Sequence, residues 1–159
     1  MKLVLDKLEK TVLAIVAFLF AVMVLALFYQ IIMRFVFERA NVWSEELTRY
    51  SFIWMSMLGS SVATRRSKNM DVDFFVNLMP RKLQKVNSIF TTVLIILFLL
   101  VIIIFGVSLV IMTHKQLSAG MQIPMSYMYA SVPTGGLLIL IFTIETIIDD
   151  LKSNNVEEG

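Results

Sequence analysis

The stretch that decides the fold reads WSEELTRYSFIWMSMLGSSVAT, at positions 43–64. Two acids and a base, Glu45, Glu46 and Arg49, stand near its start, and an apolar run follows them. If a membrane span is counted from 42 to 64, Arg49 lies about five residues in, or roughly 7.5 Å along a helix axis. An unpaired guanidinium is costly at that depth, so the sequence requires these charges to find partners.

Long uncharged runs make up most of the chain. Of the 159 residues, 58% are hydrophobic, and the mean hydropathy is +0.81. A helix needs about 20 predominantly apolar residues to cross a hydrocarbon core about 30 Å thick, and the runs predict spans at 11–33, 42–64, 88–112 and 124–147. They are solidly apolar, unlike the alternating strands of a transmembrane barrel. We expect an all-α integral membrane protein in which residues 1–159 form a single four-helix domain.

The first apolar run follows a basic start, as a secretory signal peptide would. It is longer than a signal core of about 7 to 15 residues, and it ends in YQIIMR at 29–34 rather than in a small-residue cleavage site. We therefore expect it to remain as an anchoring helix. With no Cys, one His and no cluster at metal-ligand spacing, the sequence argues against disulfides and enzymatic chemistry. No catalytic residue, cofactor or bound metal is expected.

The basic residues are distributed unevenly between the two sides of the predicted membrane. Ten of the fourteen lie at the N-terminus, in the loop between the second and third spans or in the C-terminal tail, against three on the other side. Because Lys and Arg are retained on the cytoplasmic side, both termini and the middle loop should be cytoplasmic, with residues 43–49 facing outward. Anionic lipid headgroups are the expected partner of this basic rim. There is no folded basic surface that predicts nucleic-acid binding.

The loop between the second and third spans has a helical pattern of its own. Five apolar residues between Val72 and Leu83 recur at helical spacing, while Asp71 and Asp73 take the other side. The two acids would lie in a first turn, where the helix dipole favours negative charge. We expect a short interfacial amphipathic helix at 71–79, with a plain linker as the alternative.

The fourth span contains Pro133 and two nearby glycines, Gly135 and Gly136. Proline removes one amide donor and leaves the carbonyl near Tyr129 without its helical partner, so a bend is expected there. The glycines would let another backbone approach closely, which predicts a helix-packing surface. A broken helix that binds an ion is the alternative. Transporters normally build such sites from two repeated halves, and the sequence shows no internal repeat.

The charges at 45–49 allow three interpretations. Glu45 precedes Arg49 by four residues, the favourable order for a helical ion pair, and Glu46 precedes it by three. Ser44 or Asn41 could cap the same helix end. The group could be an internal pair that anchors the helix, or one acid could stay free for a partner subunit. A proton or cation relay is the third interpretation, although no deeper acid in any predicted span would continue the path.

Four helices with both ends inside occur together with five short segments: WSEELTRYSFIW at 43–54, LG at 58–59, DVD at 71–73, LMP at 78–80 and VPTG at 132–135. In these features the chain resembles, over nearly its whole length, the small membrane subunit of tripartite ATP-independent periplasmic (TRAP) transporters. The first segment is fairly specific, whereas the others are weak alone. One departure is Met70, which stands where the family often has a histidine.

The resemblance implies a non-enzymatic subunit of a bacterial inner membrane that braces a larger transport (M) subunit. It further implies a periplasmic binding protein, a sodium gradient as the driving force, and an organic acid such as sialic acid or a C4-dicarboxylate as cargo. Sodium and cargo would be held by the large subunit. The residues expected to form the partner interface or a structural packing surface are Trp43, Glu45, Glu46, Arg49, Tyr50, Trp54, Gly59, Asp71, Asp73, Pro133, Gly135 and Gly136.

The rival function is a self-sufficient carrier or exporter built from several four-helix chains. Such a mechanism would need a titratable acid near the middle of the membrane. The first span has only Gln30 as a strongly polar group, and a buried amide more often bonds to a neighbouring helix.

Overall fold

The computed structural model describes residues 2–39, 41–67 and 80–157, and it is built of helices. Four of them are long, and a single turn, α5, precedes the last. Their bounds are Lys2–Phe35 for α1, Val42–Ser67 for α2, Arg81–Thr113 for α4, Ser126–Tyr129 for α5 and Ser131–Glu157 for α6. The expected all-helical fold with four long helices is therefore confirmed.

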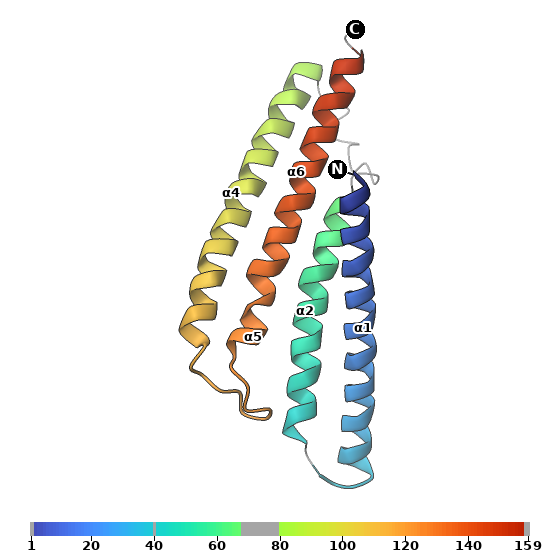
Figure 1. The fold of residues 1–159 in the computed structure, drawn as a ribbon, viewed down its shortest axis with the longest axis vertical. Helices are drawn as coiled ribbons and strands as arrows, with labels where there is room; N and C mark the ends of the chain where they lie inside the picture. Colours follow the sequence, from blue (N-terminus) through green and yellow to red (C-terminus); the bar gives the residue numbers. More distant parts are fainter. Residues whose placement is uncertain (1, 40, 68–79, 158–159) are drawn as a thin grey trace.

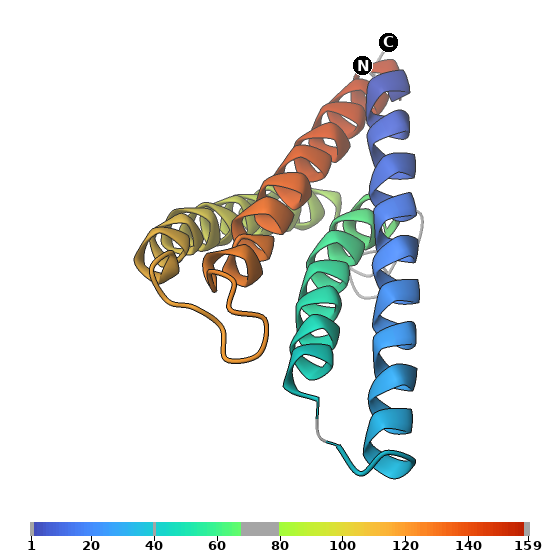
Figure 2. The same cartoon turned by 60° about the horizontal axis from the view of Figure 1, so that its bottom comes forward.

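The long helices pack in a row rather than around one centre. α1 packs on α2, α2 packs on α6, and α6 packs on α4. Figures 1 and 2 show α1 and α2 side by side, with α4 on the far side of α6. The α1–α2 connection and the loop after α4 lie at one end of the row, here called the loop end (Figure 1). The start of α1 and the end of α6 lie at the other, the terminal end.

Three helices are long and apolar enough to cross a membrane: Leu3–Phe35, Ile89–Thr113 and Ser126–Ile148. α2 has 26 residues but is not among them, so its role as the fourth span stays a prediction. The predicted interfacial helix at 71–79, with Asp71 and Asp73, lies outside the described residues.

α1 extends nine residues before the apolar run at 11–33 and two residues after it. It begins at Lys2 rather than near position 11, so Asp6 and Glu9 are helical. At its other end, Glu38 takes a left-handed φ of 52°, and the Arg39 amide donates to the Met33 carbonyl over 3.0 Å. The donor lies six residues beyond the acceptor, one more than in the Schellman arrangement, and it still satisfies a carbonyl at the helix end. A glycine usually takes the left-handed position at a helix end, whereas Glu38 takes it here, so no residue at 36–39 marks the stop.

The hydrophobic core is small and lies mainly between α1 and α2. Val12, Leu58 and Val62 form its buried centre. A second anchor is Phe142 of α6, which is completely buried. Large apolar side chains instead cover much of the exterior of α1 and α4, as expected where lipid rather than water surrounds a helix.

The proline and glycines of the last span lie where helices approach closely. A Cβ on Gly135 would come within 2.9 Å of Met57 Cβ on α2. A Cβ on Gly136 would come within 3.1 Å of Ile103 on α4, and one on Gly106 within 3.0 Å of Pro133 Cδ. α5 ends at Tyr129 and α6 begins at Ser131, so the helix is interrupted next to the carbonyl that Pro133 cannot bond. Small residues at these contacts let α6 pack against α2 and α4.

This packing predicts opposite effects of alanine at two glycines. At Gly135 the new Cβ would overlap Met57, so Gly135→Ala should destabilise the chain by about 1–3 kcal/mol, the usual cost of overpacking. At Gly59 a Cβ would meet nothing within 4 Å. Gly59→Ala should therefore stabilise the helix by up to about 1 kcal/mol, through helix propensity. Thermal unfolding of both purified variants in detergent tests the pair, and equal unfolding temperatures would contradict the close α2–α6 contact.

Candidate partner interface

The first turns of α2 direct their charges to opposite sides. Glu46 is buried, with 8% of its surface exposed, whereas the side chains of Glu45 and Arg49 are 60% and 59% exposed. This division follows from helical geometry, because neighbouring residues point about 100° apart. Glu45 and Glu46 therefore make two separate sets of contacts.

Glu46 holds the loop that follows α4. Its Oε2 accepts hydrogen bonds from the backbone amides of Gly120, over 3.1 Å, and Met121, over 2.6 Å. Its Oε1 accepts a bond of 3.3 Å from the Tyr50 hydroxyl. Hydrogen bonds to an ionised carboxylate are about twice as strong as neutral ones. Glu46 therefore ties the start of α2 to a segment more than 70 residues further along the chain.

The loop itself is a small hairpin whose tip fits against α2. Ser118 donates its amide to the Ile123 carbonyl over 2.8 Å, and Met125 donates to Gln116 over 2.8 Å. Gly120 lies at the tip, where a Cβ would come within 2.9 Å of the Val42 backbone. Only glycine allows this approach without displacement, so the hairpin can place its amides on Glu46. Figures 1 and 2 show this tip beside the start of α2.

Three aromatic residues of the opening segment also bind within the chain. Tyr50 is buried and bonds to Glu46. Trp54 donates its Nε1 proton to the Tyr127 carbonyl of α5 over 2.9 Å. Trp43 packs its ring against that of Tyr29 on α1, with 5.4 Å between centroids. These side chains connect α2 to α1 and α5 at the loop end, which is a structural use of residues that were expected at a partner interface or a packing surface.

Glu45 and Arg49 form an ion pair on the outside of α2. Arg49 Nη2 lies 2.9 Å from Glu45 Oε1, four residues back in the helix. The local pair expected from their spacing is therefore present, while Glu46 is occupied by the hairpin. An exposed pair of this kind contributes at most about 1 kcal/mol in water. Its main consequence is a polar spot on the exterior of the row of helices.

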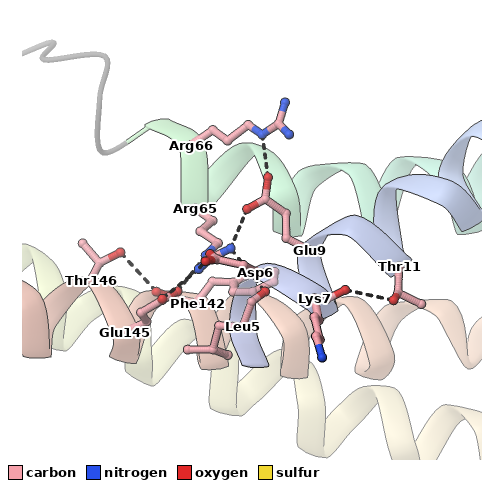
Figure 3. Close-up of polar contacts among 10 residues, drawn as sticks. All are labelled: Leu5, Asp6, Lys7, Glu9, Thr11, Arg65, Arg66, Phe142, Glu145 and Thr146. Atoms are coloured by element: carbon pink, nitrogen blue, oxygen red, sulfur yellow. Dashed lines mark hydrogen bonds and ion pairs between the residues drawn. The ribbon is translucent and has the colours of Figure 1, made fainter. Parts of the chain in front are cut away.

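A second polar cluster at the terminal end centres on Arg65 of α2 (Figure 3). Its Nε donates to Glu145 Oε2 over 2.7 Å and its Nη2 to Glu145 Oε1 over 2.8 Å, a bidentate pair with α6. Both side chains are nearly buried, at 12% and 11% exposed. The guanidinium also lies over the ring of Phe142, 5.4 Å from its centroid. Planar bidentate pairing is the arrangement for which arginine is suited and lysine is not.

The same guanidinium reaches α1. Its Nη1 donates to Glu9 Oε2 over 2.5 Å and to the Leu5 carbonyl over 3.2 Å, and its Nη2 donates to Asp6 Oδ1 over 2.7 Å. Glu9 also accepts from Nε of Arg66 over 2.8 Å. All five N–H groups of Arg65 are thereby used. Arg65 lies beyond the predicted span 42–64, and the surrounding carboxylates raise its pKa, which keeps it charged.

This cluster was not predicted from the sequence, in which Arg65 was expected only as one basic residue of a cytoplasmic rim. A signal was present. Asp6, Glu9 and Glu145 are acids within or beside long apolar helices, where an unpaired charge is costly. Each of the three needed a cation at the same end of the row, and Arg65 and Arg66 follow the apolar run of α2 directly.

The two clusters lie at opposite ends of α2, and apolar sequence separates them. Residues 50–64 of α2, 11–33 of α1, 86–113 of α4 and 116–144 of the last span carry no Asp, Glu, Lys or Arg. Within the described ranges, no group of three or more His, Cys, Asp or Glu residues is placed to hold a metal ion. The arrangement is suited to fixing helices together and to presenting a rigid surface.

Comparisons with known proteins identify the family. The chain is 32% identical over 124 residues to the sialic acid TRAP transporter permease protein SiaT of Haemophilus influenzae, covering 78% of this chain but 20% of that protein. It is 27% identical to the sialic acid TRAP transporter small permease protein SiaQ of Vibrio cholerae, covering 84% and 78% of the two chains. It is also 32% identical to the C4-dicarboxylate TRAP transporter small permease protein DctQ of Vibrio cholerae, covering 47% and 32%. The chain thus spans about a fifth of SiaT and most of SiaQ.

The family model for tripartite ATP-independent periplasmic transporters, DctQ component, matches residues 23–153, which is most of the chain. The resemblance seen in the sequence is therefore confirmed, as is the expectation of a non-enzymatic protein. The chain belongs to the DctQ family and is the multi-pass small permease subunit of a TRAP transporter.

Proposed function

We propose that this subunit braces a large permease (M) subunit in the membrane, in a sodium-coupled system that takes up an organic acid. The observation that carries the proposal is the position of its charges. Glu46 and Arg65 are held in hydrogen-bonded clusters at the two ends of α2, and the helical segments between these clusters are uncharged. A subunit built in this way offers rigidity but no charged path, so sodium and cargo are assigned to the larger partner.

The association with a large subunit is supported by the relative SiaT. The region similar to this chain makes up a fifth of that single permease polypeptide. Two proteins that occur as one chain elsewhere are held at high effective concentration there, which favours a direct contact between them. We infer the same contact for this chain, formed between separate subunits.

The cargo class follows from the relatives. SiaT and SiaQ are sialic acid transporter proteins, and DctQ of Vibrio cholerae is a C4-dicarboxylate transporter protein. A sialic acid or a C4-dicarboxylate is therefore the proposed substrate type.

The proposed location is a bacterial inner membrane, with the terminal end on the cytoplasmic side. Ten of fourteen basic residues support this orientation. The loop end, with the hairpin at 116–125, would then face the periplasm. A periplasmic binding protein is the proposed soluble partner of the complex.

The experiment is uptake by proteoliposomes that hold the chain, its large permease subunit or both, with the binding protein added outside. Labelled sialic acid and a labelled C4-dicarboxylate are the probes, each with and without an inward sodium gradient. We expect sodium-dependent uptake of one probe only when all three proteins are present. Sodium-coupled uptake by the purified chain alone would contradict the bracing role and favour a self-sufficient carrier.

A further inference from the structure

One side of α2 is covered by no other part of the described chain. Six residues at spacings of three and four are exposed along it: Glu45, Arg49, Phe52, Ser56, Ser60 and Ala63. Spacings of this kind place side chains on one face of a helix. This set is called the outer stripe of α2. The stripe runs from the charged first turns of α2 at the loop end almost to the Arg65 cluster.

The outer stripe differs in chemistry from the other exposed helix faces. The exteriors of α1 and α4 carry large apolar side chains that suit lipid, among them Phe18, Leu25, Phe28, Phe98, Ile104 and Phe105. The stripe carries an ion pair, two serines and an alanine, with Phe52 as its one large apolar group. Beside the stripe, a Cβ added to Gly59 would meet nothing within 4 Å.

Lipid is a poor neighbour for this face. Among the described residues, Arg49 donates only to Glu45, through one of its five N–H groups, so most of its donors remain available to an outside acceptor. Ionisable residues at the rim of a membrane helix are stabilised by protein partners or water rather than by acyl chains. Small side chains gain most from a neighbouring helix, because they let two backbones approach closely. Charge and shape therefore both favour a protein partner.

We propose that the outer stripe of α2 is the surface on which a membrane helix of the large permease subunit docks. The inference rests on the proposed function, and it adds the face and the chemistry of the contact. The occupant is identified by SiaT, where the rest of one permease polypeptide accompanies the region similar to this chain. The docking helix places large aliphatic side chains over Ser56 and Ser60, and an acceptor near Arg49.

The first test is photo-crosslinking in membranes that contain this chain and its large permease subunit. Benzoylphenylalanine replaces Phe52 on the stripe or, as matched controls, Phe18 of α1 and Phe98 of α4, so an aromatic group stands at each site before and after substitution. We expect a crosslink to the large subunit from position 52, and at most a weak one from 18 and 98. A crosslink from 52 to a second copy of this chain, or no protein crosslink from 52, overturns the inference.

The second test fills the stripe. Ser56→Leu with Ser60→Leu makes α2 more apolar, so the chain still inserts, but it places two large side chains where the docking helix would approach α2. We expect the amount of large subunit that copurifies with the chain to fall about tenfold, or ~1.4 kcal/mol. The matched control, Ala17→Leu with Ala21→Leu, enlarges two exposed residues of α1 and should leave copurification unchanged.

The two ideas fail differently. If the unmodified chain does not copurify with the large subunit, the proposed bracing function fails. If it does copurify and the Ser56, Ser60 variant copurifies equally well, the complex stands and the stripe is not its contact.

Discussion

Replacing Arg65 with leucine is expected to cost more stability than any other single substitution at the terminal end. The change removes all five hydrogen bonds of the guanidinium and leaves Glu145 and Glu9 facing each other with little solvent. Breaking a buried ion pair by removing one partner typically costs about 3–5 kcal/mol, because the remaining charge is uncompensated. For a chain of this size that is a fall in unfolding temperature of roughly 6–20 °C, which thermal unfolding in detergent measures directly.

Arg66 supplies the matched control. It also pairs with Glu9, over 2.8 Å, but its side chain is 61% exposed. Arg66→Leu should therefore cost at most about 1 kcal/mol. If Arg65→Leu does not accumulate at all, Arg65→Lys still decides the question, since an ammonium keeps the charge but cannot form the bidentate pair. Arg65→Lys should unfold between the wild type and the leucine variant, and unfolding at the Arg66→Leu temperature by all Arg65 variants would contradict a central role for Arg65.

A double substitution in the same cluster should change stability in the opposite direction. Arg65→Leu combined with Glu145→Leu removes both members of the bidentate pair and replaces them with apolar volume. Apolar replacement of a whole buried pair is often neutral or stabilising, unlike the loss of one member. Glu9 loses a partner in both variants but keeps Arg66. The double variant should therefore recover part of the stability lost in Arg65→Leu.

Sequence reasoning succeeded where the relevant spacing was local. The Glu45–Arg49 pair follows from a separation of four residues, and four long helices follow from the length of the apolar runs. Gly135 and Gly136 were expected at a helix-packing surface, but their spacing did not predict which helices they would meet. Composition is a coarse guide, however. α2 has a serine-rich interior and falls short of the apolar content of the other three, so its crossing of the membrane stays a prediction.

Sequence reasoning failed where two interacting residues are far apart in the chain. The Glu46 carboxylate binds amides 74 and 75 residues away, and the Arg65 guanidinium binds Glu145, 80 residues away. Helical periodicity reports only neighbours three or four residues apart, so it suggested Arg49 as a partner for Glu46. Backbone amides carry no sequence signal at all, and the hairpin that presents them depends on Gly120 and on a left-handed Gln122 with φ of 54°. The sequence at 43–49 therefore suggested a single charged group. In the structure Glu46 bonds inside the chain, whereas Glu45 and Arg49 lie on the outside of α2.

That division leads to the second large effect, at Glu46. Glutamine has the same shape as glutamate but one acceptor oxygen instead of two, and its amide group would point N–H donors at other donors. Glu46→Gln should therefore weaken the bonds to Gly120, Met121 or Tyr50 and cost about 1.5–3 kcal/mol, the range for hydrogen bonds to a charged group. The neighbouring change Glu45→Gln is the matched control, because it removes one exposed ion pair and should cost less than about 1 kcal/mol.

Hydrogen exchange separates a local effect at Glu46 from a general loss of stability. The amides of Gly120 and Met121 are held by the carboxylate itself, so in Glu46→Gln they should exchange much faster, while amides in the middle of α4 keep their protection.

If the hairpin is the surface that meets a soluble partner at the loop end, the same variant should also reduce uptake by the complete transporter without reducing copurification of the large subunit. Unchanged exchange at these two amides would mean that the hairpin holds its shape without Glu46. In that case the buried acid would have to be explained by its bond to Tyr50 alone, although a carboxylate at 8% exposure needs more than one donor to offset its desolvation.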